Sequence, residues 1–323
     1  MDRTHVDVVI PTVGRPSLAP LLGTLRSEVL AADLLAPEAA VVVVDDRARP
    51  DAALPVPRDP RFRVVAGGGR GPAAARNIGW RATSAPWVLF LDDDVELPLG
   101  WAGALALDLA RAGPGVAAVQ GRLHVPLPSH RPPSDWERNV HGLEGARWIT
   151  ADMAVRRAAL DEVDGFDEAF PRAYREDTDL ALRLLDRGWA LELGGRTTRH
   201  PVRPAPWWIS VRLQRGNADD VRLERRHGPD WRTQLGVSPG TIGAHRRTVA
   251  AGLASALAGL TGRRRLAAAL AAWWCWRTSR LTWSRIAPGP RTAREMAAMV
   301  ATSVAIPPAA CYHRLRGHLG ART

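Results

Sequence analysis

The chain has 323 residues, 46% of them hydrophobic, so it can form two domains or one domain with a long extension. Its two cysteines, Cys275 and Cys311, lack the spacing of a zinc site. They exclude a disulfide framework and fit a reducing compartment. The net charge of +11 comes from 44 basic residues that are all arginine, and it is unevenly spread. Residues 1–205 hold 25 arginines against 28 acids, whereas residues 206–323 hold 19 against five.

Strand-like and helix-like patterns alternate from the N-terminus. Residues 6–10 predict a strand directly at the start, so we expect no signal peptide and a cytoplasmic protein. The alternation predicts a mostly parallel α/β sheet with helices on both faces. The predicted elements that follow are a helix at 17–35, strands at 41–44 and 62–65, a glycine-rich loop at 67–72, a helix at 73–81 and a strand at 87–91.

A second segment, about residues 115–200, alternates less regularly. Residues 147–153 predict a strand that enters a site, and Gly165–Glu168 predicts a tight turn. Residues 176–185 predict an amphipathic helix whose first turn carries Glu176, Asp177 and Asp179. Helix capping explains one such acid better than three.

Polar residues follow three of the predicted strands. Pro11-Thr12 follows the first strand, Asp45-Asp46 ends the second, and Asp92-Asp93-Asp94 ends the strand at 87–91. The carboxyl ends of parallel strands meet at one edge of a sheet, where nucleotides bind. Adjacent carboxylates repel unless a cation lies among them, so the third group indicates a divalent metal. The alternative is a solvated acidic loop after a core strand.

These motifs resemble, in kind and in order, those of the family 2 glycosyltransferases of the GT-A fold. The resemblance covers about residues 5–203. The residues that carry it are Val9–Thr12 with Arg15 and Pro16, Val43–Asp46, Gly71–Gly79, Phe90–Asp94, Gly165–Glu168, and Glu176–Leu180 followed by Arg183.

The resemblance implies a Rossmann-like, GT-A-type sheet and a division of the chain. Residues 1–205 would form the catalytic domain, with nucleotide-sugar binding in about 1–114 and the acceptor side in about 115–205. Residues 206–323 would form a basic helical extension rich in tryptophan and arginine.

The resemblance also implies transfer of a sugar from a nucleotide diphosphate sugar to a hydroxyl acceptor, with inversion at the anomeric carbon. A divalent metal, Mn²⁺ or Mg²⁺, would neutralise the diphosphate. Asp94 and Asp92 of the Asp-x-Asp element would bind it, and His200 is a further candidate ligand. The alternative for His200 is an ordinary, partly exposed histidine beside Pro201.

Other matched positions receive roles only through the resemblance. Asp177 would be the base that takes the acceptor proton, assisted by Glu176, and Trp148 would contact the acceptor. Arg76 would lie near the base ring or the diphosphate, or would form a buried ion pair with an aspartate. Besides Arg76, the residues expected to bind the nucleotide sugar are Pro11, Thr12, Arg15, Asp45, Asp46, Gly71, Asp92 and Asp93.

The C-terminal third combines arginines with seven of the 13 tryptophans. Its uncharged runs, at 248–262, 266–276 and 296–312, are shorter than the about 20 residues of a membrane-spanning helix. Pro307-Pro308 is expected to interrupt the third run. Arginine and tryptophan beside short apolar helices favour a helix lying on the anionic inner face of the cell membrane. The alternative is a helical appendage that packs on the catalytic domain or forms a dimer.

Two other function classes remain open. A nucleotidyltransferase would need a basic, glycine-rich loop after the first strand, and Pro11–Arg15 matches that poorly. A nucleic-acid-binding or membrane-binding protein on a degenerate scaffold explains the basic tail but not the acidic strand ends. The leading hypothesis is therefore a metal-dependent glycosyltransferase that acts on a glycan or a lipid-linked glycan of the cell envelope. Nucleic acid is not expected as a partner.

Overall fold

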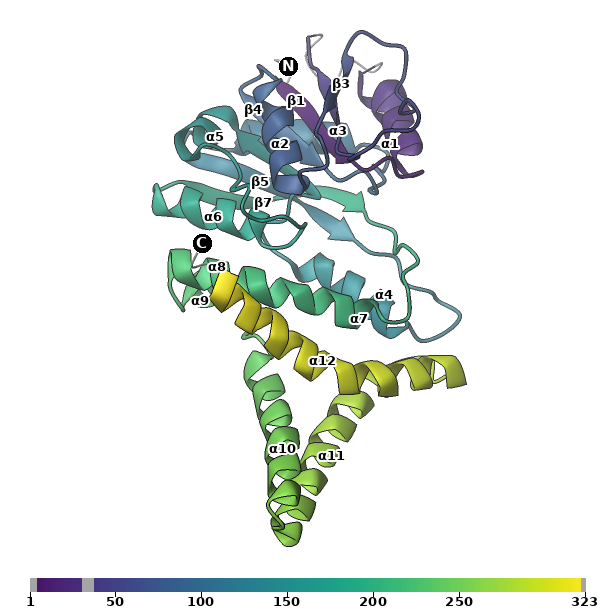
Figure 1. Cartoon of the computed structure of the whole chain (residues 1–323). Coiled ribbons are helices and arrows are strands. Elements are labelled where there is room, and N and C mark those ends of the chain that lie inside the picture. Colours follow the sequence, from purple (N-terminus) through teal and green to yellow (C-terminus); the bar gives the residue numbers. More distant parts are fainter. Residues whose placement is uncertain (1–4, 31–37, 321–323) are drawn as a thin grey trace. The chain divides into compact units, whose positions relative to one another are not determined.

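A computed structural model of the chain describes residues 5–30 and 38–320. Their internal packing divides the chain into two compact units (Figure 1). The first unit comprises Met1–Pro126 and Gly142–Pro201, and the second comprises Leu127–His141 and Val202–Thr323. Residues 127–141 therefore pack with the C-terminal helices, although the sequence patterns group them with the acceptor side.

A seven-stranded sheet in the order β3-β2-β1-β4-β6-β5-β7 forms the centre of the first unit. The parallel pairs are β1 with β2, β1 with β4, β2 with β3, and β5 with β7. Only β6 runs antiparallel to its neighbours, so the predicted mostly parallel sheet is confirmed. The strands are β1 (Val6–Thr12), β2 (Val41–Asp45), β3 (Phe62–Ala66), β4 (Trp87–Leu91), β5 (Val116–His124), β6 (Asp152–Arg156) and β7 (Ala190–Arg199).

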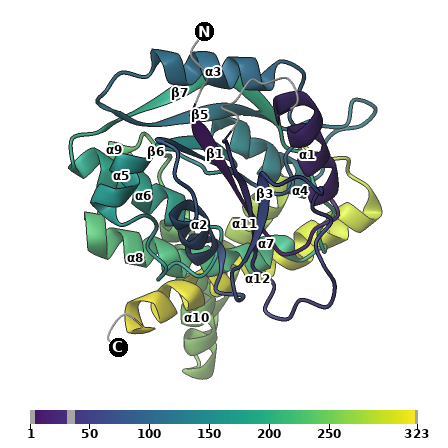
Figure 2. The ribbon, with the colours of Figure 1, turned by 90° about the horizontal axis from the view of Figure 1, so that it is seen from above.

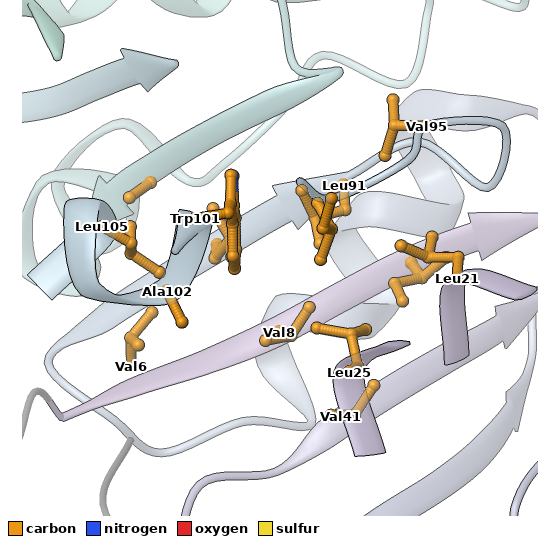
Figure 3. Packing of buried hydrophobic residues seen from close by; sticks show 14 of the residues in the cluster. Val6, Val8, Leu21, Leu25, Val41, Leu91, Val95, Trp101, Ala102 and Leu105 are labelled. Carbon is orange, nitrogen blue, oxygen red and sulfur yellow. The ribbon is translucent and has the colours of Figure 1, made fainter. Parts of the chain in front are cut away.

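Helices cover both faces of this sheet (Figure 2). On one face, α1 (Leu18–Thr24) and α3 (Trp101–Arg111) pack against the apolar side chains of β1, β2 and β4, as Figure 3 shows around Val8 and Leu91. On the other face lie α2 (Pro72–Arg81), α5 (Arg157–Val163) and α6 (Glu176–Asp186). Because β1, β2 and β4 are apolar on both sides, burial between two helical layers fixes their position.

Three predicted boundaries differ from the structure. The first strand continues to Thr12, because Pro11 lies opposite Val44 in the β1–β2 ladder. The strand expected at 147–153 begins only at Asp152, after the short 3-10 helix η2 (Gly142–Gly145) and a turn. The helix expected at 17–35 passes after Thr24 into a π-helix, η1 (Leu25–Leu30), and residues 31–35 lie outside the described residues.

The described part of the second unit is helical. Its elements are α4 (Asp135–His141), α7 (Ile209–Arg212), the 3-10 helix η3 (Leu213–Gly216), α8 (Asn217–His227), α9 (Trp231–Gln234), α10 (Ile242–Leu260), α11 (Arg264–Ile286) and α12 (Ala293–Gly320). In residues 5–30 and 38–320, no helix is long and apolar enough to cross a membrane.

The predicted interruption at Pro307-Pro308 is wrong, since α12 continues through both prolines. Ile306 and Pro307 are buried, and Ala310 on the following turn is fully buried. Tertiary packing of this segment therefore offsets the backbone hydrogen bonds that the prolines remove.

Candidate active site

The polar residues predicted from the strand ends lie at the carboxyl edge of the sheet. Thr12 ends β1 opposite Asp45, the last residue of β2. Asp92–Asp94 follow β4 directly, and His200 follows β7, where its backbone N–H donates to the carbonyl of His124 at 2.8 Å. The sheet thereby gathers groups that are up to 188 residues apart in the chain.

Asp92, Asp94 and His200 form the candidate metal centre. Each offers one ligand atom, and these atoms all lie within 4.8 Å of one another. His200 Nε2 is 3.6 Å from Asp94 Oδ1, and both residues are buried, whereas Asp92 is half-buried. The His200 Nδ1 atom is buried and has no hydrogen-bond partner among the described residues. Two carboxylates and an imidazole are a donor set that fits Mn²⁺.

Asp93, between the two candidate ligands, has a different environment. Thr12 Oγ1 and Arg15 Nη1 each donate a hydrogen bond of 2.5 Å to its carboxylate. The Gly14 N–H in turn donates to Thr12 Oγ1 at 2.9 Å. Asp93 therefore holds the loop after β1 against the end of β4, and this role leaves metal binding to its neighbours.

Arg76 links the metal centre to the acidic start of α6. Its guanidinium donates to Asp92 Oδ1 at 3.0 Å and to Glu176 Oε1 at 2.9 Å, and its side chain is 3% exposed. The guanidinium also lies 5.6 Å from the centre of the Phe166 ring. The buried ion pair that the sequence left open for Arg76 is therefore present.

Glu176 and Asp177 begin α6 with different surroundings. Glu176 is buried against Arg76, and burial together with the Asp177 charge raises its pKa to about 8. Asp177 is half-buried, and burial raises its pKa although Arg76 opposes the shift. The Thr178 N–H donates to Asp177 Oδ1 at 2.6 Å. A carboxylate with a raised pKa and access to solvent has the properties of a general base.

Asp179 has a structural partner. Arg183 Nε donates to Asp179 Oδ2 at 2.7 Å, and Asp179 is fully buried. The two residues therefore form an ion pair at i, i+4, a spacing that stabilises a helix.

Asp46 organises the glycine-rich loop that precedes α2. The backbone N–H groups of Arg70 and Gly71 both donate to its carboxylate at 2.9 Å. Burial raises the pKa of Asp46, while these N–H groups oppose the shift. Gly71 has φ +96°, and a Cβ atom there would lie 2.9 Å from the Pro171 carbonyl oxygen. The loop is therefore held in one conformation by a carboxylate rather than free at the surface.

Asp45 is covered by a neighbouring arginine. Arg47 donates to both carboxylate oxygens of Asp45, from Nε at 2.8 Å and from Nη2 at 2.7 Å, and these hydrogen bonds lower the pKa of Asp45. The aliphatic part of Arg47 lies close to Gly14, where a Cβ atom would be 3.0 Å from Arg47 Cδ. The two aspartates at the end of β2 therefore have separate partners.

Asn77 and Glu168 hold the turn at 165–168 in place, a role that the sequence motifs did not predict. Asn77 Nδ2 donates to the Phe166 carbonyl and to Glu168 Oε1, at 2.8 and 3.0 Å, and the Phe166 N–H returns a bond to Asn77 Oδ1. Arg70 also binds Glu168. These contacts fasten the turn at 165–168 to α2 and to the glycine-rich loop. The presence of a polar Asn on the buried side of a helix was the available signal.

Trp148 precedes the strand β6, and Asp152 is its first residue. Trp148 has φ +62° and is 9% exposed, a strained backbone conformation for an aromatic residue. Asp152 is fully buried and accepts hydrogen bonds from Trp101 Nε1 and Arg196 Nε, each at 2.9 Å. Asp152 is thus a partner in a buried network that joins β6 to α3 and β7.

The chain is similar to glycosyltransferases in three comparisons. The family described as "Glycosyl transferase family 2" matches residues 7–164. The pre-mycofactocin glycosyltransferase of Mycobacterium tuberculosis is 30% identical over 216 residues, which are 60% of this chain and 44% of that protein. The chain thus spans less than half the length of this curated relative.

Among solved structures, a mannosyltransferase from Pyrobaculum calidifontis in complex with GDP-Man and Mn²⁺ is similar over 97% of this chain and 87% of that one. The TM-score is 0.56 and the sequence identity is 19%, so this likeness supports the fold.

Proposed function

We propose that the chain, whose residues 7–164 match glycosyl transferase family 2, belongs to this family. It would transfer a sugar from a nucleotide diphosphate sugar to an acceptor hydroxyl, with inversion and with a divalent metal. The observation that carries this proposal is the meeting of Asp92, Asp94 and His200 at the carboxyl edge of the sheet, within 4.8 Å of one another. Arg76 connects this cluster to the carboxylates that begin α6. The same edge of the sheet would therefore hold both a metal bound to phosphate and the base.

The donor would bind along this edge. Asp94, Asp92 and His200 would hold Mn²⁺ or Mg²⁺, which when bound stabilises the negative charge that develops on the leaving diphosphate. Thr12 and Arg15, positioned by Asp93, would line the donor site. Pro11, Asp45, Asp46 and Gly71 border the same edge, with Asp46 acting through the loop that it organises.

Asp177 would accept the proton of the acceptor hydroxyl while the acceptor oxygen attacks the anomeric carbon. Attack from the side opposite the diphosphate inverts the configuration at that carbon. Arg76 binds Glu176 and holds it in place, whereas Asp177 beside it is half-buried and has no ion pair with Arg76 among the described contacts. Trp148 would support the acceptor.

We propose a glycan or a lipid-linked glycan of the cell envelope as the acceptor, and a cytoplasmic protein in peripheral contact with the anionic inner face of the membrane. Basic helices with exposed apolar side chains bind anionic membranes, and a lipid-linked acceptor lies in the membrane. Binding of the helices would therefore bring the protein to its acceptor. The second candidate acceptor is pre-mycofactocin, which the name of the 30% identical relative favours.

The direct experiment mixes the protein with Mn²⁺, a panel of nucleotide diphosphate sugars and each acceptor. Nuclear magnetic resonance of the product reports the anomeric configuration. An inverted glycoside supports the proposal, and a retained configuration contradicts the in-line mechanism. Absence of transfer from every donor, in the presence of either acceptor, would contradict the proposed activity.

A further inference from the structure

The helices α10 and α11 form an antiparallel hairpin (Figure 1). Small residues of α10 face α11, and Trp274 of α11 packs against one of them. A Cβ atom at Gly252 would be 3.1 Å from the Trp274 ring, and one at Gly259 would be 3.9 Å from Ala267 Cβ. Ser255 Oγ donates to the Ala267 carbonyl at 2.9 Å.

Large apolar residues of the same helices point outward. On α10, Leu253, Leu257 and Leu260 are 68%, 63% and 87% exposed, and their spacing of four and three residues puts them on one stripe. On α11, Trp273 and Trp276 are 42% and 55% exposed. Helices in water bury such side chains, whereas small residues inside and large ones outside are typical of helices packed in lipid.

The charge of this region is of one sign. Residues 231–294 contain 11 arginines and no aspartate or glutamate. Arg263–Arg265 lie at the turn of the hairpin, and all three are exposed. On α11, the guanidinium groups of Arg277 and Arg280 lie 5.7 and 5.8 Å from the rings of Trp273 and Trp276. Paired indole and guanidinium groups suit the headgroup level of a bilayer.

We propose that the hairpin docks on an anionic lipid bilayer through a leucine–tryptophan surface. This surface consists of Leu253, Leu257, Leu260, Leu266, Trp273 and Trp276. It enters the boundary between headgroups and acyl chains, and the exposed Arg263–Arg265 at the turn and Arg280 on α11 bind lipid phosphates. The inference rests on the peripheral membrane contact in the proposed function and assigns that contact to specific residues.

The other occupants of such a surface fit less well. In a two-fold dimer of this hairpin the same patch meets itself, so arginines would face arginines without any acid to neutralise them. A nucleic acid would use the arginines and could stack on tryptophan, but it offers no apolar partner for the exposed leucines of α10. Anionic lipid satisfies both the leucines and the arginines.

The test is co-sedimentation of the full-length protein with vesicles of phosphatidylcholine alone or with about a quarter phosphatidylglycerol. We expect binding to the anionic vesicles. The triple variant Leu253→Ser, Leu257→Ser, Leu260→Ser should bind at least about tenfold more weakly. The triple variant Arg263→Gln, Arg264→Gln, Arg265→Gln should bind about a hundred-fold more weakly.

Matched controls lie in the first unit. Leu99 and Leu107 are exposed leucines, and the double variant Leu99→Ser, Leu107→Ser should bind like wild type. The exposed arginines Arg58, Arg111 and Arg187, changed together to glutamine, remove the same charge as the turn variant. They should reduce vesicle binding far less.

Several results would overturn the inference. These are failure of the wild-type protein to bind anionic vesicles, undiminished binding of the leucine variant, and a dimer in solution that only the leucine variant loses. If the wild-type protein binds duplex DNA and both variants keep their vesicle binding, the partner of this surface is nucleic acid and not lipid. The rise in melting temperature with nucleotide diphosphate and Mn²⁺, measured on the same samples, reports the donor site separately. A normal rise without vesicle binding therefore rejects only the docking surface.

Discussion

Arg76 shows how one residue can connect the two halves of a reaction site. Its buried guanidinium binds Asp92, which belongs to the candidate metal centre, and Glu176, which precedes the candidate base. A buried cation between two acids lowers the cost of bringing both carboxylates out of water. Because Asp177 directly follows Glu176, the same arginine also links the candidate base to Asp92.

The role of Asp177 can be separated from donor binding. We predict that Asp177→Asn lowers the rate of sugar transfer by about 10²–10⁴-fold, because the acceptor proton loses its base. Binding of nucleotide diphosphate should be unchanged, since the amide keeps the size of the side chain. Asp161→Asn, an exposed position on α5, is the matched control and should leave both quantities unaltered. Transfer at the wild-type rate in Asp177→Asn would assign the base elsewhere.

Glu176 makes stability depend on pH. Burial raises its pKa from the ordinary 4.5 to about 8, so between these values the folded state holds a proton that the unfolded state has lost. The free energy of unfolding should therefore fall as the pH rises from about 5 to 8, by an amount on the order of 1–3 kcal/mol.

Glu176→Gln removes that titration and should flatten the pH dependence. Denaturant unfolding of both proteins at constant ionic strength measures the effect. An equal slope in wild type and variant would show that Glu176 does not titrate in this range.

At the level of elements, the loop between β3 and α2 depends on its glycines, of which Gly71 has the backbone conformation least suited to a side chain. We predict that Gly71→Ala destabilises the protein by about 1–3 kcal/mol, because φ is +96° and the new Cβ would press on Pro171. Gly103→Ala, inside α3 with open space around its Cβ position, should instead stabilise by about 0.5–1 kcal/mol. Denaturant unfolding distinguishes the two signs. Stabilisation by Gly71→Ala would contradict the strained loop.

The sequence predicted the elements whose local signals agree with their tertiary environment. β2 and β4 are apolar runs followed by acids, so both the strand and its functional end could be recognised. The hydrogen-bond partners of Asp46 could not be predicted from the sequence, because they are backbone N–H groups of a loop 24 residues further along the chain. Likewise Pro307 signals a break, and only the packing around α12 reveals that the helix continues.

At the level of the whole molecule, the chain combines two units with different composition. The first has a sheet edge lined with acids, and the second has 11 arginines without an acid over residues 231–294. The grouping of residues 127–141 with the second unit could not be predicted, since nothing local distinguishes this segment from its neighbours. The candidate metal centre belongs to the first unit, and the proposed attachment to lipid belongs to the second.

The most direct test of the candidate metal and donor site is the melting temperature with UDP, GDP, TDP, CDP or AMP, each with Mn²⁺, Mg²⁺ or EDTA. A ligand that binds only the folded state raises this temperature. We predict a rise with one of the diphosphates and Mn²⁺, abolished by EDTA and by Asp94→Ala, while Asp161→Asn responds like wild type. A rise that persists in EDTA, or in Asp94→Ala, would contradict a metal held by Asp92, Asp94 and His200.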